Sequence, residues 1–323
     1  MRVLVLGASG LLGHNVLKQL IVQGHEVAVL LRRKNSLQLD EADRVSQIVE
    51  PIWDITVLRQ AMIGCDAIIN CAGITDMSLL RYTDYLPVNR NLPAMLVSLM
   101  ETLGVSVLVH VSTANTIGYG TLESPASESN VMQEPFLNSF YARSKEEGEH
   151  MLISAARHHP DWHVVIVNPG FMIGPFDVKP SSGALLLFGY RHRLVAVPKG
   201  GKSFVAVEAV ASAVVNALVR GTNGQRYLAT GENLSFKELF CLQAKVCGYR
   251  QKIVLLPKWI CRLGGLVGDL LRYFHVATSV STDNVNQLLI TEYYDNKQSL
   301  SELQMPDISI AQAIQSFHAW RDR

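Results

Sequence analysis

The chain opens with an apolar segment that runs into three evenly spaced glycines. Residues 2–6 are of strand type, Gly7, Gly10 and Gly13 follow at intervals of three, and residues 11–23 have the apolar spacing of a helix. A second apolar segment at 26–31 completes a strand–helix–strand unit. Such glycines permit a tight turn, leave room for phosphate and let the helix pack close to the strand. Because the first N–H groups of the helix point at this space, we predict a dinucleotide-binding fold.

The alternation of strand and helix continues through the first half of the chain. Apolar strands are expected at 67–71, 105–111 and 163–167, with helices at 91–103 and 141–158. Strands that are apolar throughout are typical of a parallel sheet covered on both faces, and right-handed crossovers make that sheet doubly wound. We therefore expect an α/β fold, a doubly wound parallel Rossmann sheet with a smaller, mostly helical substrate-binding lobe.

The pattern weakens after Gly170. Residues 171–203 are rich in proline and glycine and favour loops, residues 204–230 return to a strand, a helix and a strand, and helices predominate from residue 231. We predict a Rossmann domain of residues 1–170 and 204–230 and a substrate-binding lobe of residues 171–203 and 231–323.

The composition argues against several classes of partner. The chain has 323 residues, is 48% hydrophobic and carries a net charge of +1, which gives no support for a nucleic-acid or membrane partner. Its five cysteines form no Cys-x-x-Cys pair, so we expect no metal site and no disulfides, but buried thiols in a cytoplasmic protein. Residues 259–274 are apolar with three glycines; we expect them to line a substrate pocket or a partner interface rather than a membrane, since their charges give only a modest basic face.

The residues after the second strand bear on the choice of cofactor. An NAD-specific site places an acidic residue about 20 positions after the glycines, where it binds the ribose diol. This chain has Arg32 there, followed by Arg33 and Lys34, and no carboxylate between Val27 and Leu39. Guanidinium groups bind a 2′-phosphate through charge-assisted hydrogen bonds. We predict NADP, with NAD possible; a basic surface loop or an arginine stacked on adenine are the alternatives.

Two further segments supply chemistry. Tyr141 and Lys145 are four residues apart at the start of a predicted helix, so they share one face, where an ammonium group can stabilise a phenolate and lower the tyrosine pKa. Ser112 and Thr113 follow the strand at 105–111, at the edge where open α/β sheets bind ligands. A hydroxyl there can hydrogen-bond a substrate carbonyl oxygen. Taken singly, each segment is also compatible with an ordinary helix start or turn.

At this point the chain resembles the extended (atypical) short-chain dehydrogenase/reductase superfamily. The similarity is greatest to the NAD(P)-dependent epimerase/dehydratase and dihydroflavonol 4-reductase-like branch. It covers nearly the whole chain and rests on the order and spacing of these segments: Gly7-x-x-Gly10-x-x-Gly13, Trp53-Asp54-Ile55, Asn70-Cys71-Ala72-Gly73, Val88-Asn89, Val111-Ser112-Thr113, Tyr141-x-x-x-Lys145, Asn168-Pro169-Gly170, Ile173-Gly174-Pro175-x-Asp177, Phe204-Val205-Ala206-Val207 and Tyr294-Asp295.

The resemblance implies a role for each matching residue. Thr113 would polarise a carbonyl, Tyr141 would be the catalytic acid/base, and Lys145 would tune the tyrosine and hold the nicotinamide ribose. Thr113 is preferred to Ser112 because the family's catalytic hydroxyl is usually the later of the pair. The cofactor would be bound by Gly7, Ser9, Gly10, Leu11, Leu12, Gly13, Arg32, Asp54, Ile55, Cys71, Ala72, Gly73, Lys145, Pro169 and Gly170, with Asp54 and Ile55 beside the adenine and Pro169 and Gly170 over the nicotinamide. The family often has arginine where this chain has Asn168.

These roles predict an NADP-dependent oxidoreductase that reduces an aldehyde or ketone. Two alternatives remain: a nucleotide-sugar epimerase with tightly bound NAD(P), and a non-catalytic dinucleotide sensor. We expect a homodimer, since helices 91–103 and 141–158 pair in dimers of the family. Asn89 is expected to act either in a proton relay, as in relatives, or as a helix cap. His110, within a strand, is expected to be a hydrogen-bonded core residue.

Overall fold

The computed structural model describes residues 1–34, 36–37, 45–178 and 182–322. Seven strands of these residues form one parallel sheet in the order β10-β6-β5-β4-β1-β2-β3. They are β1 (Arg2–Leu6), β2 (Glu26–Leu31), β3 (Val45–Val49), β4 (Ala67–Asn70), β5 (Val107–Val111), β6 (His163–Pro169) and β10 (Arg226–Ala229). The order reverses at β1, from which β2 and β3 lie on one side and β4, β5, β6 and β10 on the other. The predicted doubly wound sheet is confirmed.

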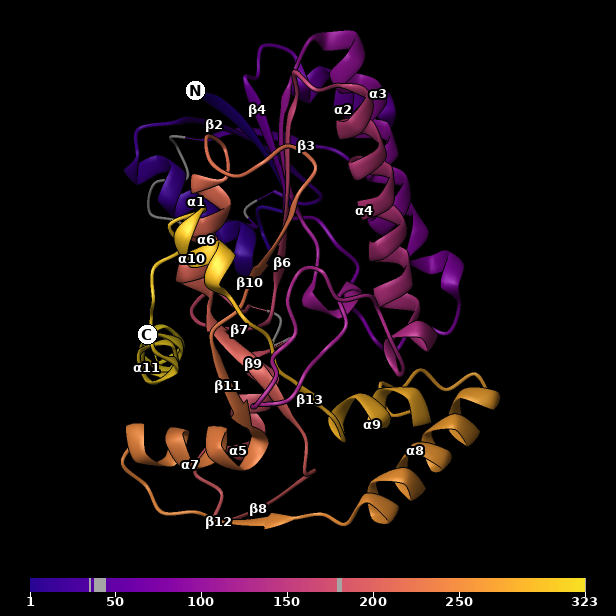
Figure 1. Cartoon of the computed structure of the whole chain (residues 1–323), viewed down its shortest axis with the longest axis vertical. Coiled ribbons are helices and arrows are strands. Elements are labelled where there is room, and N and C mark those ends of the chain that lie inside the picture. Colours follow the sequence, from indigo (N-terminus) through magenta and orange to yellow (C-terminus); the bar gives the residue numbers. More distant parts are fainter. Residues whose placement is uncertain (35, 38–44, 179–181, 323) are drawn as a thin grey trace.

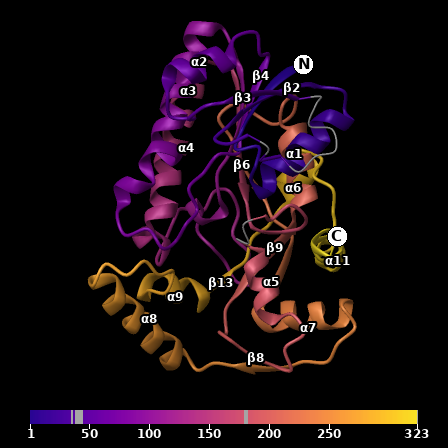
Figure 2. The same ribbon diagram turned by 180° about the vertical axis from the view of Figure 1, so that it is seen from behind.

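Helices cover both faces of this sheet (Figures 1 and 2). Helices α1 (Leu11–Val22) and α6 (Val207–Asn216) pack together on one face, and α2 (Ile55–Met62), α3 (Leu92–Leu103) and α4 (Phe140–His158) lie on the other. Residues of each strand alternate between the two layers: Val3 and Val5 join the core under α1, while Leu4 and Leu6 join the core under α3. Burial on both faces explains the uninterrupted apolar strands.

The edge strand β3 was not anticipated from the sequence. Its residues Ser46 and Gln47 are exposed, and only Val45 is fully buried. A strand at the edge of a sheet needs less apolar surface, and its pattern therefore gives a weak signal. β3 pairs with β2 over five residue positions, from Val27 with Val45 to Leu31 with Val49.

A second group of elements lies beyond the carboxyl edge of the main sheet (Figure 1). Its small sheet joins β11 (Glu232–Ser235), β9 (Gly201–Ala206) and β13 (Thr291–Glu292), with β7 (Phe171–Ile173) also paired to β9. Strands β8 (Leu194–Val197) and β12 (Lys252–Leu255) form a separate pair. The helices of this part are α5 (Gly183–Gly189), α7 (Phe236–Val246), α8 (Lys258–Tyr273), α9 (Thr282–Leu288) and α11 (Ile310–Arg321). The short helix α10 (Lys297–Ser301) instead packs against β10 of the main sheet, beside α6 in Figure 1.

Residues 171–203, predicted to be rich in loops, also contain short regular elements that the sequence did not indicate. They contain β7, α5, β8 and the start of β9. These elements have only three to seven residues, and the glycines and prolines between them obscure the pattern on which such a prediction depends. β9 spans residue 204, where we placed a domain boundary, and its partners are strands of the small sheet. β6 runs through Gly170 directly into β7, so the small sheet stands next to the carboxyl ends of the main strands.

Candidate active site

The three glycines of the first turn have different structural roles. Gly7 has φ +78°, and a Cβ there would lie 2.6 Å from the backbone nitrogen of Ala72. A Cβ on Gly13 would lie 2.2 Å from the carbonyl oxygen of Gly7, so this residue sets how closely α1 approaches β1. A Cβ on Gly10 would meet only the same oxygen, at 3.4 Å. Gly7 and Gly13 are therefore required by packing, whereas Gly10 leaves open space at the start of α1.

This turn fits the pyrophosphate of a dinucleotide. Gly10 is the N-cap of α1, has an extended conformation and has no side chain to satisfy the first N–H groups of the helix. Those groups and the helix dipole favour an anion at this point. Ala72 and Gly73 follow the end of β4, directly beside the turn. The turn lies at the reversal of strand order, where open α/β sheets bind dinucleotides.

The predicted adenine-end residues lie at the same edge. Leu6, the residue before the glycine turn, pairs with Leu30 of β2. Arg32 follows Leu30 by two residues and is therefore close to this turn, with its side chain exposed. Asp54 is the N-cap of α2, where its carboxylate accepts hydrogen bonds from the backbone of Thr56 and Val57, and Ile55 begins that helix with an exposed side chain. The Asp54 side chain is thus engaged in capping.

The predicted catalytic residues converge at the ends of β5 and α4. The ammonium group of Lys145 is buried and donates a hydrogen bond of 2.7 Å to the carbonyl oxygen of Val111, the last residue of β5. Thr113 follows two residues later, is buried, and its hydroxyl hydrogen-bonds the phenol of Tyr141. A Cβ on Gly73 would lie 3.7 Å from the Lys145 nitrogen, which places the cofactor loop against the same ammonium group.

The competing hydroxyl of Ser112 has a different environment. Its oxygen is buried and has no hydrogen-bond partner among the described residues, whereas the Thr113 oxygen contacts the Tyr141 phenol and accepts from the Asn115 backbone. A group that hydrogen-bonds the Tyr141 phenol can share one substrate oxygen with it. The geometry therefore favours Thr113.

The pKa shifts of Tyr141 and Lys145 differ from those predicted from the sequence. Burial raises the pKa of Tyr141, the hydrogen bond from Thr113 lowers it in part, and the Glu149 carboxylate raises it again. Burial lowers the pKa of Lys145 to about 8, while the charge of Glu149 acts to raise it. The expected lowering of the tyrosine pKa by lysine is not the dominant effect here, because both groups lie in a poorly solvated site.

A buried carboxylate beneath these residues was not identified from the sequence. Glu149 is fully buried one helical turn after Lys145, and its Oε1 accepts hydrogen bonds of 2.7 Å from the Thr116 hydroxyl and 2.7 Å from the Asn168 amide. Arg226 lies 3.7 Å from its Oε2. The only sequence signal is that the four-residue spacing of Tyr141 and Lys145 continues to this residue.

Asn168 connects this carboxylate to Thr113. Its amide nitrogen also donates a 3.0 Å hydrogen bond to the backbone carbonyl of Thr113 and one of 3.0 Å to the Thr116 hydroxyl. Asn168 thus holds the loop after β5, at the position where the family often has arginine. Pro169 and Gly170 follow it, and a Cβ on Gly170 would lie 2.6 Å from the carbonyl oxygen of Ser203. The turn after β6 is therefore fixed beside the catalytic edge.

Asn89 is not a helix cap. It lies in a turn of π-helix, η3 (Pro87–Asn91), and its side chain pairs with both backbone groups of Ile74 and donates 3.0 Å to the Ser144 hydroxyl. The wide turn places this amide between the loop after β4 and the helix that carries Tyr141 and Lys145. The cap alternative is wrong because these contacts are tertiary.

Two other expectations concern single residues. His110 is buried and its Nδ1 accepts a 3.1 Å hydrogen bond from the Asn70 amide, which confirms a hydrogen-bonded core residue.

The expectation of buried thiols is wrong in general: Cys65 is buried, but Cys241 on α7 is exposed. Burial raises the pKa of Cys71 in the cofactor loop to about 12, so this thiol is not a nucleophile. No cluster of three or more metal-ligating side chains occurs within the part of the chain that the structure describes.

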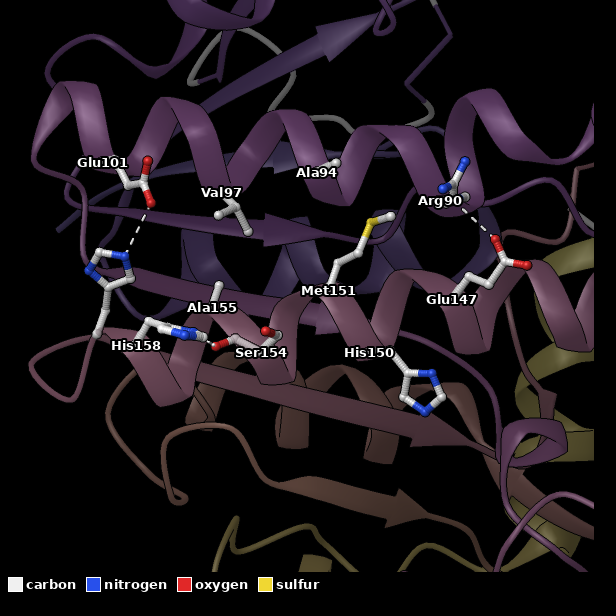
Figure 3. A pocket seen from close by; sticks show the side chains of 11 residues that line it. Arg90, Ala94, Val97, Glu101, Glu147, His150, Met151, Ser154, Ala155 and His158 are labelled. Atoms are coloured by element: carbon white, nitrogen blue, oxygen red, sulfur yellow. Dashed lines mark hydrogen bonds and ion pairs between the residues drawn. The ribbon is translucent and has the colours of Figure 1, made fainter.

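A groove of about 880 Å³ lies elsewhere, along the outer surfaces of α3 and α4 (Figure 3). Ion pairs cross it near both ends: Arg90 with Glu147 at 3.0 Å, and Glu101 with His159 at 3.1 Å. Ala94, Val97 and Met151 line its middle. None of the residues that line it is among the predicted catalytic or cofactor residues. Lys145 of α4 instead reaches the carbonyl oxygen of Val111 at the end of β5. The groove is therefore distinct from the candidate active site.

The fold and the site together define a nicotinamide dinucleotide-dependent enzyme of the extended short-chain dehydrogenase/reductase type. A family model described as the NAD dependent epimerase/dehydratase family matches residues 3–229. The chain belongs to this family, which confirms the resemblance inferred from its motifs.

Similar proteins extend over the full length of the chain. It is 28% identical to a putative dihydroflavonol 4-reductase of Synechocystis sp., over 98% of this chain and 93% of that protein. It is 26% identical to sterol demethylase protein B of Methylococcus capsulatus, over 99% and 98%. Among solved structures, the UDP-glucose 4-epimerase of Thermotoga maritima has a TM-score of 0.79 at 17% identity, covering 100% of this chain and 99% of that one. At that identity the likeness shows the shared fold.

Proposed function

We propose that the protein is an NADP-dependent reductase of an aldehyde or ketone. The observation that carries the proposal is the convergence of Thr113, Tyr141 and Lys145 at the edge of the sheet beside the glycine turn. A bound nicotinamide dinucleotide supplies the hydride. Thr113 and Tyr141 hydrogen-bond the substrate carbonyl oxygen, and the Tyr141 phenol gives its proton to that oxygen as negative charge develops.

The remaining residues of the site hold this arrangement. Lys145, cationic below its pKa of about 8, stabilises the phenolate left on Tyr141 and offers N–H donors to the ribose hydroxyls. Its alignment depends on the Val111 carbonyl oxygen. Asn168 fixes the backbone of Thr113 from the other side.

Preference for NADP is supported by charge at the end of β2. Arg32 is exposed directly after this strand, and no carboxylate of the sequence stands between Val27 and Leu39 to receive a ribose diol. The activities for which relatives are named support a carbonyl substrate: these relatives include a putative dihydroflavonol 4-reductase and a ketoreductase of Stigmatella aurantiaca, 25% identical over 83% of this chain and 80% of that one.

Consumption of NADPH with a panel of aldehydes and ketones tests the proposal. Thr113→Val is expected to reduce kcat by about 10²-fold or more, and Tyr141→Phe to abolish turnover, because each removes a group that contacts the reacting oxygen. Ser112→Ala serves as the matched control and leaves kcat within about threefold. A panel without any turnover, or a fully active Tyr141→Phe variant, contradicts the proposal.

The epimerase alternative predicts a different result in the same assay. Purified protein would then carry nucleotide and convert UDP- or GDP-sugars without added cofactor. The residues after Thr113 are Ala114 and Asn115 rather than the acidic pair typical of dehydratases in this group, which disfavours that subclass. Tight NADP binding without turnover of any substrate would favour a sensor.

We further propose a cytoplasmic homodimer joined through α3 and α4. The apolar floor of the groove, with ion pairs at its ends, is suited to a self-complementary contact (Figure 3). Light scattering on the purified protein should give twice the mass of the chain, 35.7 kDa. Val97→Arg together with Met151→Arg should give a monomer.

A further inference from the structure

Helix α8 packs onto the protein through its glycines. A Cβ on Gly265 would lie 2.9 Å from the Cα of Thr282, and one on Gly268 would lie 2.1 Å from the carbonyl oxygen of Val280. Gly264, the residue directly before Gly265, has no atom within 4 Å of such a Cβ. The segment that leads into α9 is thus in backbone contact with one narrow stripe of α8. This contact fixes the rotation of the helix about its axis.

The same inward side of α8 carries its polar contacts. The Asp269 carboxylate accepts a 3.0 Å hydrogen bond from the Thr282 backbone, and the Arg272 guanidinium donates to the backbone oxygens of Thr278 and Met77. An ordinary amphipathic helix buries its apolar stripe and exposes its polar one. Helix α8 has the opposite arrangement.

The apolar side of α8 therefore faces solvent. Seven large side chains of this helix and its C-cap are 53–77% exposed: Trp259, Leu263, Leu266, Val267, Leu270, Tyr273 and Phe274. Their spacing of three and four residues places them on one face. In Figures 1 and 2, α9 lies between α8 and β13, so the side of α8 opposite α9 points away from the body of the protein. Exposed apolar surface of this continuity indicates a partner.

Charge around this face identifies the partner. Between residues 250 and 276 the chain has five basic side chains and a single acidic one, Asp269. Arg272 is held on the inward side of α8 by its backbone hydrogen bonds, which leaves Arg250, Lys252, Lys258 and Arg262 as the other basic residues of this segment. The whole chain has a net charge of only +1, so the remainder is negative. Trp259 and Tyr273 stand near opposite ends of the helix, as aromatic residues do at the boundary between lipid tails and headgroups.

We propose that α8 is a membrane-surface helix, lying in the headgroup region of a bilayer rich in anionic lipid, with its apolar face toward the acyl chains. An apolar face flanked by basic residues is the pattern of interfacial helices. Of the residues that the structure describes, no helix is long and apolar enough to cross a membrane. A second copy of the chain on this face is disfavoured because it would bring two basic rims together. The sequence alone disfavoured a membrane because the charges of residues 259–274 give only a modest basic face, and it did not reveal which face of this helix is buried.

Flotation of the purified protein with vesicles tests the proposal. Binding is expected to vesicles of phosphatidylcholine with phosphatidylglycerol, and to weaken with salt and without the anionic lipid. The double variant Leu266→Gln and Leu270→Gln should lower the partition coefficient more than tenfold, because two exposed apolar anchors are removed. A matched control, Leu122→Gln with Val22→Gln, changes two exposed apolar residues elsewhere and should bind like the wild type.

Fluorescence provides a second readout that does not depend on catalysis or on loss of folding. Trp259 is 67% exposed and Trp53, on the main domain, is 53% exposed. Anionic vesicles should shift the emission to the blue in the wild type and in Trp53→Phe, and should not do so in Trp259→Phe. Absence of vesicle binding by the wild type overturns the proposal. So does a lipid-free dimer that the Leu266 and Leu270 variant dissociates, since a second copy would then cover the face.

Discussion

Replacing each glycine of the first turn by alanine should separate stability from cofactor binding. In Gly13→Ala the new methyl carbon would lie 2.2 Å from the Gly7 carbonyl oxygen, more than 1 Å inside an ordinary contact. Both atoms belong to the backbone or are fixed to it, so β1 and α1 must separate. Gly10→Ala places its methyl 3.4 Å from that oxygen, toward open space.

The two substitutions therefore differ in free energy of unfolding. Overpacking costs about 3 kcal/mol when backbone must move, and the helix propensity of alanine returns about 1 kcal/mol, which leaves Gly13→Ala destabilised by about 2 kcal/mol. With an unfolding entropy of about 2.1 cal/mol/K per residue, this lowers Tm by about 3 °C for a chain of this length. Gly10→Ala changes only the residue at the N-cap, at a cost of about 0.5 kcal/mol.

Binding of NADPH should follow the reverse order. The Gly10→Ala methyl group occupies the space that lets backbone approach the pyrophosphate, so Kd should rise at least about tenfold with the fold intact. Calorimetric unfolding without cofactor and titration of NADPH fluorescence measure the two effects. Wild-type affinity in Gly10→Ala, or a loss of Tm equal to that of Gly13→Ala, would refute the separate roles assigned to these glycines.

Three further substitutions test other parts of the argument. Arg32→Ala should weaken NADPH about tenfold or more through loss of charge-assisted hydrogen bonds and leave NADH unchanged; an unchanged ratio of the two Kd values in direct titration would speak against a 2′-phosphate contact. Glu149→Gln removes the charge that raises the pKa of the Lys145 ammonium group, so this pKa should fall below its present value of about 8 and the alkaline limb of the kcat–pH profile should move to lower pH. The control Glu146→Gln, on the same helix, should move this limb less. Equal pH profiles of the two variants would contradict the coupling of Glu149 to Lys145. Gly268→Ala should lower Tm because its methyl meets backbone at 2.1 Å, while Gly264→Ala should raise Tm by helix propensity; the opposite order in thermal unfolding would show that α8 is held differently.

Local pattern was sufficient for every strand of the main sheet except β3, whose apolar signal is weak. The apolar strands, the glycine turn and the pair Tyr141 and Lys145 are short-range signals, since each depends on neighbours within one turn or one strand. The carboxyl ends of parallel strands meet at one edge, so the alternation of strand and helix also placed Thr113 near the glycines. The family model over residues 3–229 agrees with that inference.

Contacts between distant segments had no such signal. Asn168 appeared only as a departure from the family, yet its amide joins Thr113 to the buried Glu149. The sequence left two roles open for Asn89, a proton relay or a helix cap, because its partner Ile74 is 15 residues away. Small strands such as β7 acquire their identity from pairing with β9, whose residues lie about 30 positions later in the chain.

By itself the sequence determined the class of fold and the glycine turn and indicated the candidate reacting side chains, because these depend on periodicity, glycine geometry and residue chemistry. Tertiary structure decided which groups surround those side chains and therefore the direction of their pKa shifts. Burial, for example, lowers the pKa of Lys145 to about 8. It also decided which face of α8 is buried. The apolar periodicity of that helix is visible in the sequence, but only the contact of Gly265 and Gly268 with residues 280–282 turns its apolar side to solvent.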